Sequence, residues 1–250
     1  MRNLKLVLSY DGADFFGWQV QPEAPTVQGT LAAAIARLTG EKLLPQGSGR
    51  TDAGVHALAQ VAVFATASPM PAENFVKALN DILPPAIRVL EAEAVDFAFH
   101  PRRSAKAKTY HYRILRSSLC PPFLARYVWH FPYPLDEVAM QQAAGLVVGE
   151  HDFTSFAAVD PERGREEGEL SNVRTVFSSV WERQGHEFTY TVRGSGFLHH
   201  MVRNLAGTFV QVGKGAIPAA EVSRILDARN RSAAGATAPA RGLYLAGVEY

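Results

Sequence analysis

The sequence predicts an α+β protein made of two subdomains with a cleft between them. Short segments that alternate apolar and polar residues are typical of half-buried strands, and longer segments with apolar residues every three or four positions are typical of helices. Glycine and proline separate these segments. The 250 residues, 47% hydrophobic and 20% charged, suit a globular chain of one large or two small domains. We expect subdomains at residues 1–104 and 105–250.

The first hundred residues alternate strands and helices. In chain order we expect a strand at 3–10, a helix from Thr26 to Gly40, a loop at 46–54, a strand at 60–66, a helix from Pro71 to Pro84 and a strand at 87–95. Thr26 is a suitable N-cap, and Gly40 a suitable C-terminal stop. Pro71 and Pro84 fit the start and the end of the second helix, because proline lacks the amide that a helix interior needs.

The second half repeats this kind of pattern without a clear sequence repeat. We expect a strand at 108–117, a helix at 135–148, a hairpin at 173–194 turning near Gln184–Gly185, helices at about 198–212 and 218–228, a final strand at 242–250, and long loops at 117–134 and 158–171.

Composition excludes several classes of protein. Cys120 is the single cysteine, so no intramolecular disulfide can form, and no cluster of Cys and His has the spacing of a structural zinc site. The N-terminus lacks the apolar core of a signal peptide, and no apolar run approaches the about 20 residues of a membrane span. We therefore expect a soluble cytoplasmic protein without a metal and without membrane contact.

Charge is segregated along the chain although the net charge is only +1. No acidic residue lies between Asp96 and Asp136, where the basic residues are Arg102, Arg103, Lys106, Lys108, Arg113, Arg116 and Arg126. Acidic residues gather elsewhere, notably at 160–169. Such segregation is typical of a polyanion-binding face, although a solvated basic surface would give the same pattern.

The segment Gly47–Ala57, GSGRTDAGVHA, carries the main chemical signal. Its glycines let the backbone approach a ligand closely and leave Arg50, Thr51 and Asp52 as the larger polar side chains. Asp52 is the only acid between Glu41 and Glu73, so it is a candidate catalytic carboxylate. A turn aspartate bonded to its own backbone is the structural alternative. The loop lacks the Lys-Ser/Thr pair of a phosphate-binding P-loop.

Several segments, in order, resemble the TruA family of tRNA pseudouridine synthases. SGRTDAGVHA resembles the family's signature loop, and the other matching segments are YDGADFFGWQVQP, KTYHYRI, GSGFLHHMVRNLAGTFVQVGKG and TAPARGLYLAGVEY. The resemblance implies the pseudouridine synthase fold, with mostly antiparallel sheet in each subdomain and helices packed on one face. One departure is Val20, where many relatives would have a basic residue, and it puts one RNA contact in doubt.

The resemblance also implies roles for three residues: Asp52 as the nucleophile, Tyr110 as the active-site tyrosine and Arg203 as the basic partner of the aspartate. Each has a structural alternative. A tyrosine on an alternating strand is common for packing reasons. Arg203 lies in an apolar helix, where an arginine is costly to bury unless it is paired, so a carboxylate partner is expected. His199 and His200 would clamp a metal poorly, because adjacent helical residues point about 100° apart.

The implied reaction converts uridine to pseudouridine in the anticodon stem-loop of tRNA, at positions 38, 39 and 40, on a homodimer. The reaction breaks the N1–C1′ bond and rejoins the uracil through C5, so no cofactor is expected. The uridine must leave its stack, at a cost of a few kcal/mol. We assign Arg50 to the vacated space. Phosphate contacts are assigned to Arg102, Arg103, Lys106 and Lys108.

Two alternatives stay open from the sequence. An RNA N-glycosylase would need a positioned water and would release free uracil. A non-catalytic RNA-binding protein would use only the basic surface, and Asp52→Asn would then leave its function intact.

Overall fold

Contacts between Cα atoms divide the chain of the computed structural model into two units, and the structure describes residues 1–159 and 171–250. Unit 1 comprises Met1–Lys108 with Tyr244–Tyr250, and unit 2 comprises Thr109–Leu243. The acidic stretch 160–169 and most of the loop expected at 158–171 lie outside the described residues. The boundary expected between residues 104 and 105 stays a prediction, because a grouping of contacts does not define units that fold independently.

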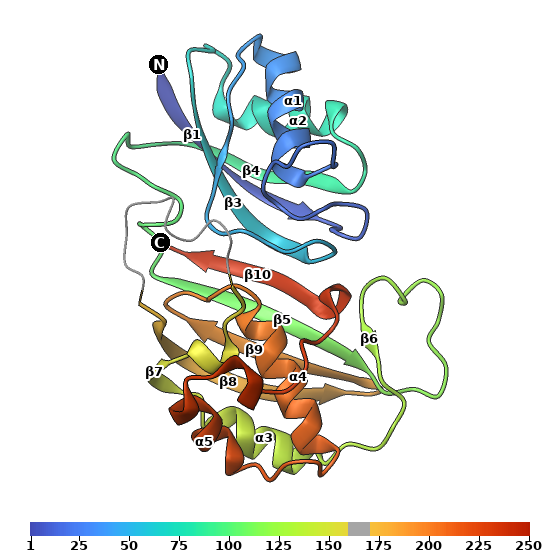
Figure 1. The fold of residues 1–250 in the computed structure, drawn as a ribbon. Helices are drawn as coiled ribbons and strands as arrows, with labels where there is room; N and C mark the ends of the chain where they lie inside the picture. Colours follow the sequence, from blue (N-terminus) through green and yellow to red (C-terminus); the bar gives the residue numbers. More distant parts are fainter. Residues whose placement is uncertain (160–170) are drawn as a thin grey trace. The chain divides into compact units, whose positions relative to one another are not determined.

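Unit 1 is a sheet with two helices on one face (Figure 1). Its elements are β1 (Arg2–Tyr10), α1 (Val27–Thr39), β2 (Gln46–Gly47), β3 (His56–Thr66), α2 (Ala72–Ile82), β4 (Ile87–Val95) and β10 (Leu243–Glu249), which joins unit 1 from Tyr244 onward. The strand order is β4-β1-β3-β10, with β2 paired to β3. β1 runs antiparallel to both β3 and β4. β10 runs parallel to β3, where Tyr244 pairs with His56, and this pairing draws the chain's last residues into unit 1.

The core of unit 1 follows from the alternation in β1. Leu4, Leu6 and Leu8 are fully buried while their neighbours along the strand are half-buried. α1 begins at the cap predicted from the sequence, since the Thr26 side chain accepts a hydrogen bond from the Gly29 amide. α1 ends at Gly40, which adopts the left-handed conformation that glycine permits.

Unit 2 also packs its long helices on one face of a sheet (Figure 1). Its elements are β5 (Ala107–Leu115, in unit 2 from Thr109), β6 (Trp129–His130), α3 (Glu137–Gly145), β7 (Gly149–Asp152), η1 (Thr154–Phe156), β8 (Val173–Gln184), β9 (Glu187–Gly194), α4 (Met201–Gly213), α5 (Glu221–Ala228), η2 (Arg231–Ala233) and η3 (Ala240–Gly242). The strand order is β5-β9-β8-β7, with β6 paired to β5. β8 and β9 form the expected hairpin.

The main elements were predicted, and the α+β class with mostly antiparallel sheet and helices on one face is confirmed. The expected cleft between the two subdomains stays a prediction. The short strands β2, β6 and β7 were not predicted, because segments of two to four residues carry no readable period. α4 begins at Met201, three residues later than expected, since His200 in a left-handed conformation precedes it.

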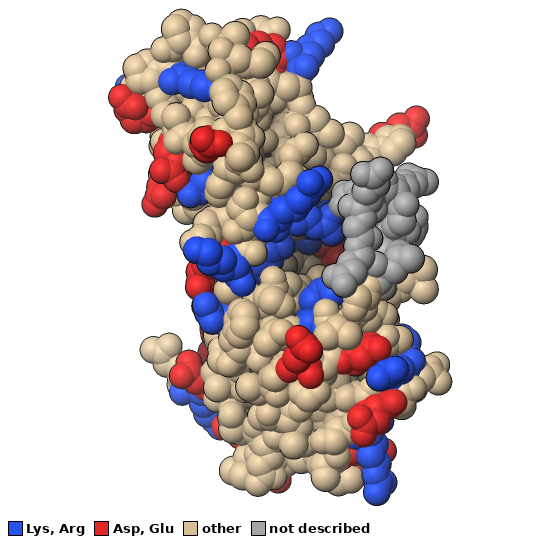
Figure 2. All heavy atoms as spheres, turned by 90° about the vertical axis from the view of Figure 1, so that its left-hand side faces the viewer, with Lys and Arg blue, Asp and Glu red and all other residues tan. Residues whose placement is uncertain are grey.

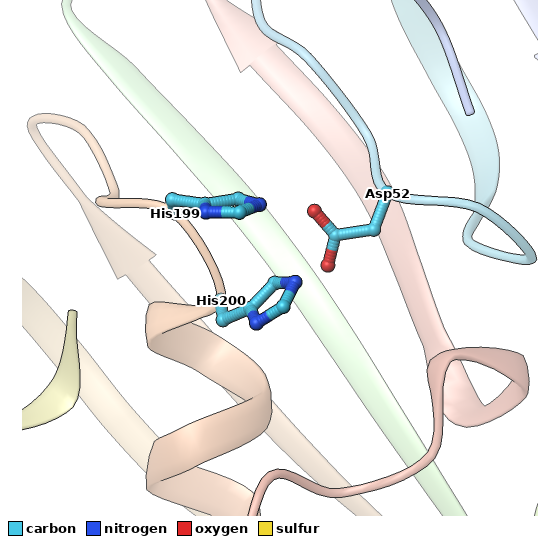
Figure 3. A group of neighbouring side chains, drawn as sticks. All are labelled: Asp52, His199 and His200. Carbon is cyan, nitrogen blue, oxygen red and sulfur yellow. The ribbon is translucent and has the colours of Figure 1, made fainter. Parts of the chain in front are cut away.

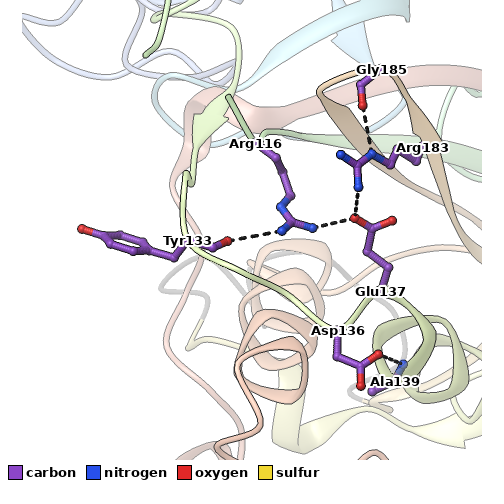
Figure 4. A network of polar contacts seen from close by, with 7 residues as sticks. All are labelled: Arg116, Tyr133, Asp136, Glu137, Ala139, Arg183 and Gly185. Carbon is purple, nitrogen blue, oxygen red and sulfur yellow. Dashed lines mark hydrogen bonds and ion pairs between the residues drawn. The ribbon is translucent and has the colours of Figure 1, made fainter. Parts of the chain in front are cut away.

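A polar network fastens the long segment 116–136 to the body of unit 2 (Figure 4). Arg116 and Arg183 both donate to the same Glu137 oxygen, each over 2.6 Å. Arg116 also reaches the Tyr133 carbonyl at 3.4 Å, and Arg183 donates to the Gly185 carbonyl at 2.9 Å. Asp136 caps α3 by accepting from the Ala139 amide. Glu137 therefore links the end of β5, the first turn of α3 and the β8–β9 hairpin.

Candidate active site

The Asp52 loop, residues Gly47–Val55, links β2 to β3 in unit 1. The Val55 amide donates to the Asp52 carbonyl at 3.1 Å, which closes a tight turn. Gly54 lies inside this turn at φ +77°, a conformation that glycine adopts without strain. The Asp52 side chain is half-buried, and its carboxylate projects from the loop (Figure 3). The sequence motif therefore displays its carboxylate on a turn with defined backbone geometry.

The segment after β1, residues 12–18, contacts the backbone of the Asp52 loop directly. The Trp18 amide donates to the Thr51 carbonyl at 3.0 Å, and the Gly54 amide donates to the Phe15 carbonyl at 3.2 Å. A Cβ atom at Gly17 would lie 2.5 Å from the Thr51 carbonyl oxygen, and one at Gly12 would lie 1.9 Å from the Val55 carbonyl oxygen. Both positions therefore require glycine, because any side chain would push the two segments apart.

Lys108 lies against the same loop. Its ammonium group donates to the Ser48 carbonyl at 2.6 Å. This contact fixes the first part of the loop. Of the four residues expected to contact phosphate, Lys108 is therefore also a structural contact of the loop. Arg50 is half-buried on the loop itself.

The other three expected phosphate contacts belong to the exposed end of unit 1's chain before β5. Arg102, Arg103 and Lys106 are exposed. The backbone amides of Arg102 and Arg103 both donate to Nδ1 of His100, over 3.1 and 3.2 Å, so the imidazole shapes this turn. Figure 2 shows some Lys and Arg side chains grouped together and others scattered among Asp and Glu side chains. The position of these residues suits a polyanion contact, and their role stays a prediction.

Tyr110 lies on β5 and is 8% exposed. Its ring meets the ring of Phe197, from the segment before α4, edge to face with centroids 5.0 Å apart. Two residues later on the same strand, Tyr112 is fully buried, and its hydroxyl donates to the Pro239 carbonyl at 2.8 Å. Burial raises the pKa of Tyr112, so this phenol stays protonated at neutral pH.

Arg203 is half-buried on the first turn of α4. Its Nε donates to the Ala238 carbonyl at 2.8 Å, and the Ala238 amide donates back to the Arg203 carbonyl at 3.1 Å. The segment before β10 is thus docked on α4 beside this arginine. A carboxylate was expected as the partner of Arg203, and the pairing with Asp52 stays a prediction.

His199 and His200 precede α4 and are not part of it (Figure 3). The argument that adjacent helical residues point apart is therefore wrong for this pair. Their ring centroids lie 4.0 Å apart with an interplanar angle of 39°. His199 Nδ1 lies 3.0 Å from the Val159 carbonyl oxygen, which anchors its ring. Two neighbouring imidazoles do not by themselves define a metal site, and the expected absence of a metal stays a prediction.

Several residues that shape the Asp52 loop were not singled out from the sequence: Tyr10, Gly12, Gly17, Ser48 and Gln60. The sequence did indicate that Gln60 could be a polar residue at a buried strand, since it is the first residue of the apolar run QVAVFAT. The glycines were visible in YDGADFFGWQ, but the sequence gives no indication of which backbone they approach.

Comparisons with known proteins agree with the motif. The family model described as tRNA pseudouridine synthase matches residues 6–102 and 143–250. The tRNA pseudouridine synthase A of Solibacter usitatus is 52% identical over 250 residues, covering 100% of both chains. The protein of the same name from Moorella thermoacetica is 47% identical, covering 99% of both chains.

The solved structure of a Cbf5-Nop10-Gar1 complex is only distantly similar, with a TM-score of 0.33, 13% identity, and 82% of this chain aligned to 54% of that chain. Among the described residues, the helices are all too short or too polar to cross a membrane. The family model matches most of the chain, and two full-length relatives are 52% and 47% identical to it. These two findings establish the family. The chain belongs to the tRNA pseudouridine synthase family.

Proposed function

We propose that this enzyme converts uridine to pseudouridine in the anticodon stem-loop of tRNA, at positions 38, 39 and 40, with Asp52 as the catalytic nucleophile. Family membership supports the reaction and the tRNA substrate. The role of Asp52 is supported by the structure of its own loop. Its carboxylate projects, half-buried, from a turn that Gly12 and Gly17 hold by direct backbone contact.

The reaction is an isomerisation in which atoms and electrons balance. The N1–C1′ bond breaks, the uracil turns, and a C5–C1′ bond forms. The proton on C5 is lost and N1 gains one, so neither an oxidant nor an energy-supplying cofactor is consumed. Positive charge builds at C1′ as the first bond breaks, and the carboxylate of Asp52 stabilises this charge or attacks C1′ directly.

The remaining residues take supporting roles in this proposal. Tyr110 stacks on the flipped uracil and helps to transfer the C5 proton, and Arg203 pairs with Asp52. Arg50 fills the space that the flipped base leaves. Contacts from Arg102, Arg103, Lys106 and Lys108 to phosphates offset the cost of unstacking the base. The Phe197 ring packs edge to face against Tyr110 and supports its ring from one side.

Tritium release from tRNA transcribed with 5-tritiated uridine tests the reaction and the role of Asp52 together. We expect release by the wild type and, for Asp52→Asn, a loss of at least about a thousandfold with tRNA binding retained. Asp81→Asn is the matched control, because it makes the same charge change at an exposed position on α2 and should keep full activity.

Transcripts with cytidine at position 38, 39 or 40 then identify the modified sites. Wild-type activity in Asp52→Asn would exclude a carboxylate mechanism. Free uracil without pseudouridine would indicate an N-glycosylase, and binding without either product would indicate a non-catalytic RNA-binding protein.

The assembly and the compartment belong to the same proposal. We expect a homodimer in the cytoplasm, where tRNA is available. Light scattering after size-exclusion chromatography measures the mass directly. A mass of about 27.2 kDa, that of one chain, would contradict the dimer.

A further inference from the structure

A group of buried polar side chains in unit 1 comprises Ser48 and Thr51 of the Asp52 loop, Tyr10 of β1 and Gln60 of β3. Ser48 and Gln60 are 0% exposed, Tyr10 is 3% exposed and Thr51 is 7% exposed. Polar groups are costly to bury and are normally hydrogen-bonded when they are buried. Side-chain hydrogen bonds of Tyr10 and Gln60 reach residues 48–51 of the loop, so these two residues are candidate supports for the residue that the loop displays.

One half of the support holds the residue directly before Asp52. The hydroxyl groups of Tyr10 and Thr51 lie 2.8 Å apart. Burial raises the pKa of Tyr10 to about 12, so the phenol keeps its proton and stays a hydrogen-bond partner across the neutral range. The Thr51 carbonyl accepts from the Trp18 amide at 3.0 Å. The side chain of Thr51 therefore bonds to β1, and its backbone bonds to Trp18 in the segment that follows β1.

The other half holds the start of the loop. The Gln60 Nε2 donates to the Gly49 carbonyl at 2.9 Å, and its Oε1 accepts from the Ser48 hydroxyl at 2.7 Å. The Ser48 amide donates to the Val61 carbonyl at 2.8 Å. Gln60 is thus a side-chain clamp on two consecutive loop residues. Because the clamp and the Tyr10 contact lie on either side of Arg50, the backbone on both sides of that residue is fixed.

We propose that Tyr10 and Gln60 are positioning residues that hold the Asp52 carboxylate where it meets the substrate. The proposal rests on the proposed function, in which Asp52 acts on C1′ of the uridine. A loop has few backbone hydrogen bonds of its own, so side chains must supply the precision that a reacting group needs. A misplacement of about 1 Å can cost about a hundredfold in rate.

The decisive variant is Tyr10→Phe, which removes one hydroxyl group and leaves the ring. Tyr190→Phe is the matched control. Tyr190 is 0% exposed in unit 2, and its hydroxyl lies 2.8 Å from that of Ser179, so it makes the same kind of buried bond away from the loop. We expect kcat for Tyr10→Phe to fall about tenfold with KM for tRNA changed less than about twofold, and kcat for Tyr190→Phe to stay at the wild-type value.

A second pair of variants separates positioning from folding. Thr51→Val keeps the shape of the side chain and loses the hydroxyl, whereas Thr51→Ser keeps the hydroxyl. We expect Thr51→Ser to retain most of the kcat that Thr51→Val loses. Wild-type kcat in Tyr10→Phe, or an equal loss in Tyr10→Phe and Tyr190→Phe, would overturn the proposal.

A readout without activity keeps this proposal distinct from the proposed function. If the wild type releases no tritium from any tRNA, the proposed function fails first. Amide hydrogen exchange of peptides that cover residues 47–55 then tests the support itself. Faster amide exchange in Tyr10→Phe than in Tyr190→Phe would show that the Tyr10 hydroxyl stabilises the loop. Equal exchange in the two variants would overturn the positioning proposal.

Discussion

The Asp52 loop of unit 1 and α4 of unit 2, which carries Arg203, each have close backbone contacts with a neighbouring segment. Different kinds of hydrogen bond fix the two regions. The loop depends on side-chain hydrogen bonds from other segments, made by the neutral side chains of Tyr10 and Gln60 and by the Lys108 ammonium group. α4 has its own ladder of hydrogen bonds, and the segment docked on it is held by Arg231. The Arg231 guanidinium donates to Asn204 at 3.0 Å and to Thr237 at 3.1 Å.

This difference predicts whether a lost side-chain contact lowers mainly the stability of the region or mainly the rate of the reaction. A helix positions Arg203 through backbone hydrogen bonds, so a lost side-chain contact nearby should cost stability more than geometry. A loop positions Asp52 through a few side-chain contacts, so a similar loss should cost geometry and therefore rate. Four predictions test this difference.

The largest effect is expected from Gly207→Ala on α4. A Cβ atom there would lie 1.9 Å from the Ala236 carbonyl oxygen, and backbone cannot yield as a side-chain tip can. We expect unfolding free energy to fall by about 3 kcal/mol, measured by urea denaturation. Gly145→Ala on α3 is the control. Apart from its chain neighbours and the nearby backbone of its own helix, no described atom lies within 4 Å of its added Cβ, so it should be neutral or gain up to about 1 kcal/mol. Equal stability of the two variants would contradict the close approach.

Gly17→Ala should show a loss of stability together with a loss of rate. Gly17 has φ +86°, and its Cβ would lie 2.5 Å from the Thr51 carbonyl oxygen, so both backbone strain and a clash with the loop are expected. We expect a loss of about 2 kcal/mol in unfolding free energy and a fall in kcat. Gly40→Ala, at φ +78° with open space around it, isolates the strain and should cost about 1 kcal/mol with kcat unchanged. A similar kcat in both variants would show that the clash does not reach Asp52.

Thr237→Val compares the two regions directly with Thr51→Val. The Thr237 hydroxyl donates to the Asn204 side chain at 2.7 Å and accepts from Arg231 at 3.1 Å, whereas the Thr51 hydroxyl bonds to that of Tyr10. We expect Thr51→Val to lose about 1 kcal/mol of unfolding free energy and Thr237→Val, which loses two hydrogen bonds, to lose at least as much. Single-turnover rates should then differ, with a clear loss for Thr51→Val and little change for Thr237→Val. A larger rate loss in Thr237→Val would reverse the comparison.

The smallest effect is expected from an ion pair of unit 2. Arg113 donates to both oxygens of Glu187, at 2.6 and 2.7 Å, and these bonds hold the pKa of Glu187 below its usual value. A carboxyl whose pKa is lower in the folded state stabilises the fold above its unfolded pKa, and this stabilisation is lost as pH falls through the folded pKa.

Glu187→Gln should therefore be about 1 kcal/mol less stable than the wild type at pH 7. The gap should close as pH falls below 4.5, the usual value for this group. Thermal unfolding of both proteins from pH 7 to pH 3 checks this, and a gap that does not depend on pH would exclude the ion pair as its cause.

The order of the main elements could be predicted from the sequence, because hydrophobic period and capping residues are local. Thr26 caps α1 and Gly40 ends it as predicted, and β1 buries alternate leucines. The sequence also determined the family, through motifs in a fixed order. The isolated carboxylate in a glycine-rich segment made Asp52 a candidate, the family resemblance implied its role as nucleophile, and that role stays a prediction.

The contacts that hold the Asp52 loop became visible only in the folded structure. Tyr10 reads as an ordinary strand residue and Gln60 as the start of an apolar run, yet the two meet the loop from β1 and β3. The start of α4 and the pairing of β10 with β3 were likewise decided by neighbours in space. Period and composition report only whether a residue is buried. Which distant group a buried polar atom bonds depends on how the strands pair, and that information is shared among residues far apart in the chain.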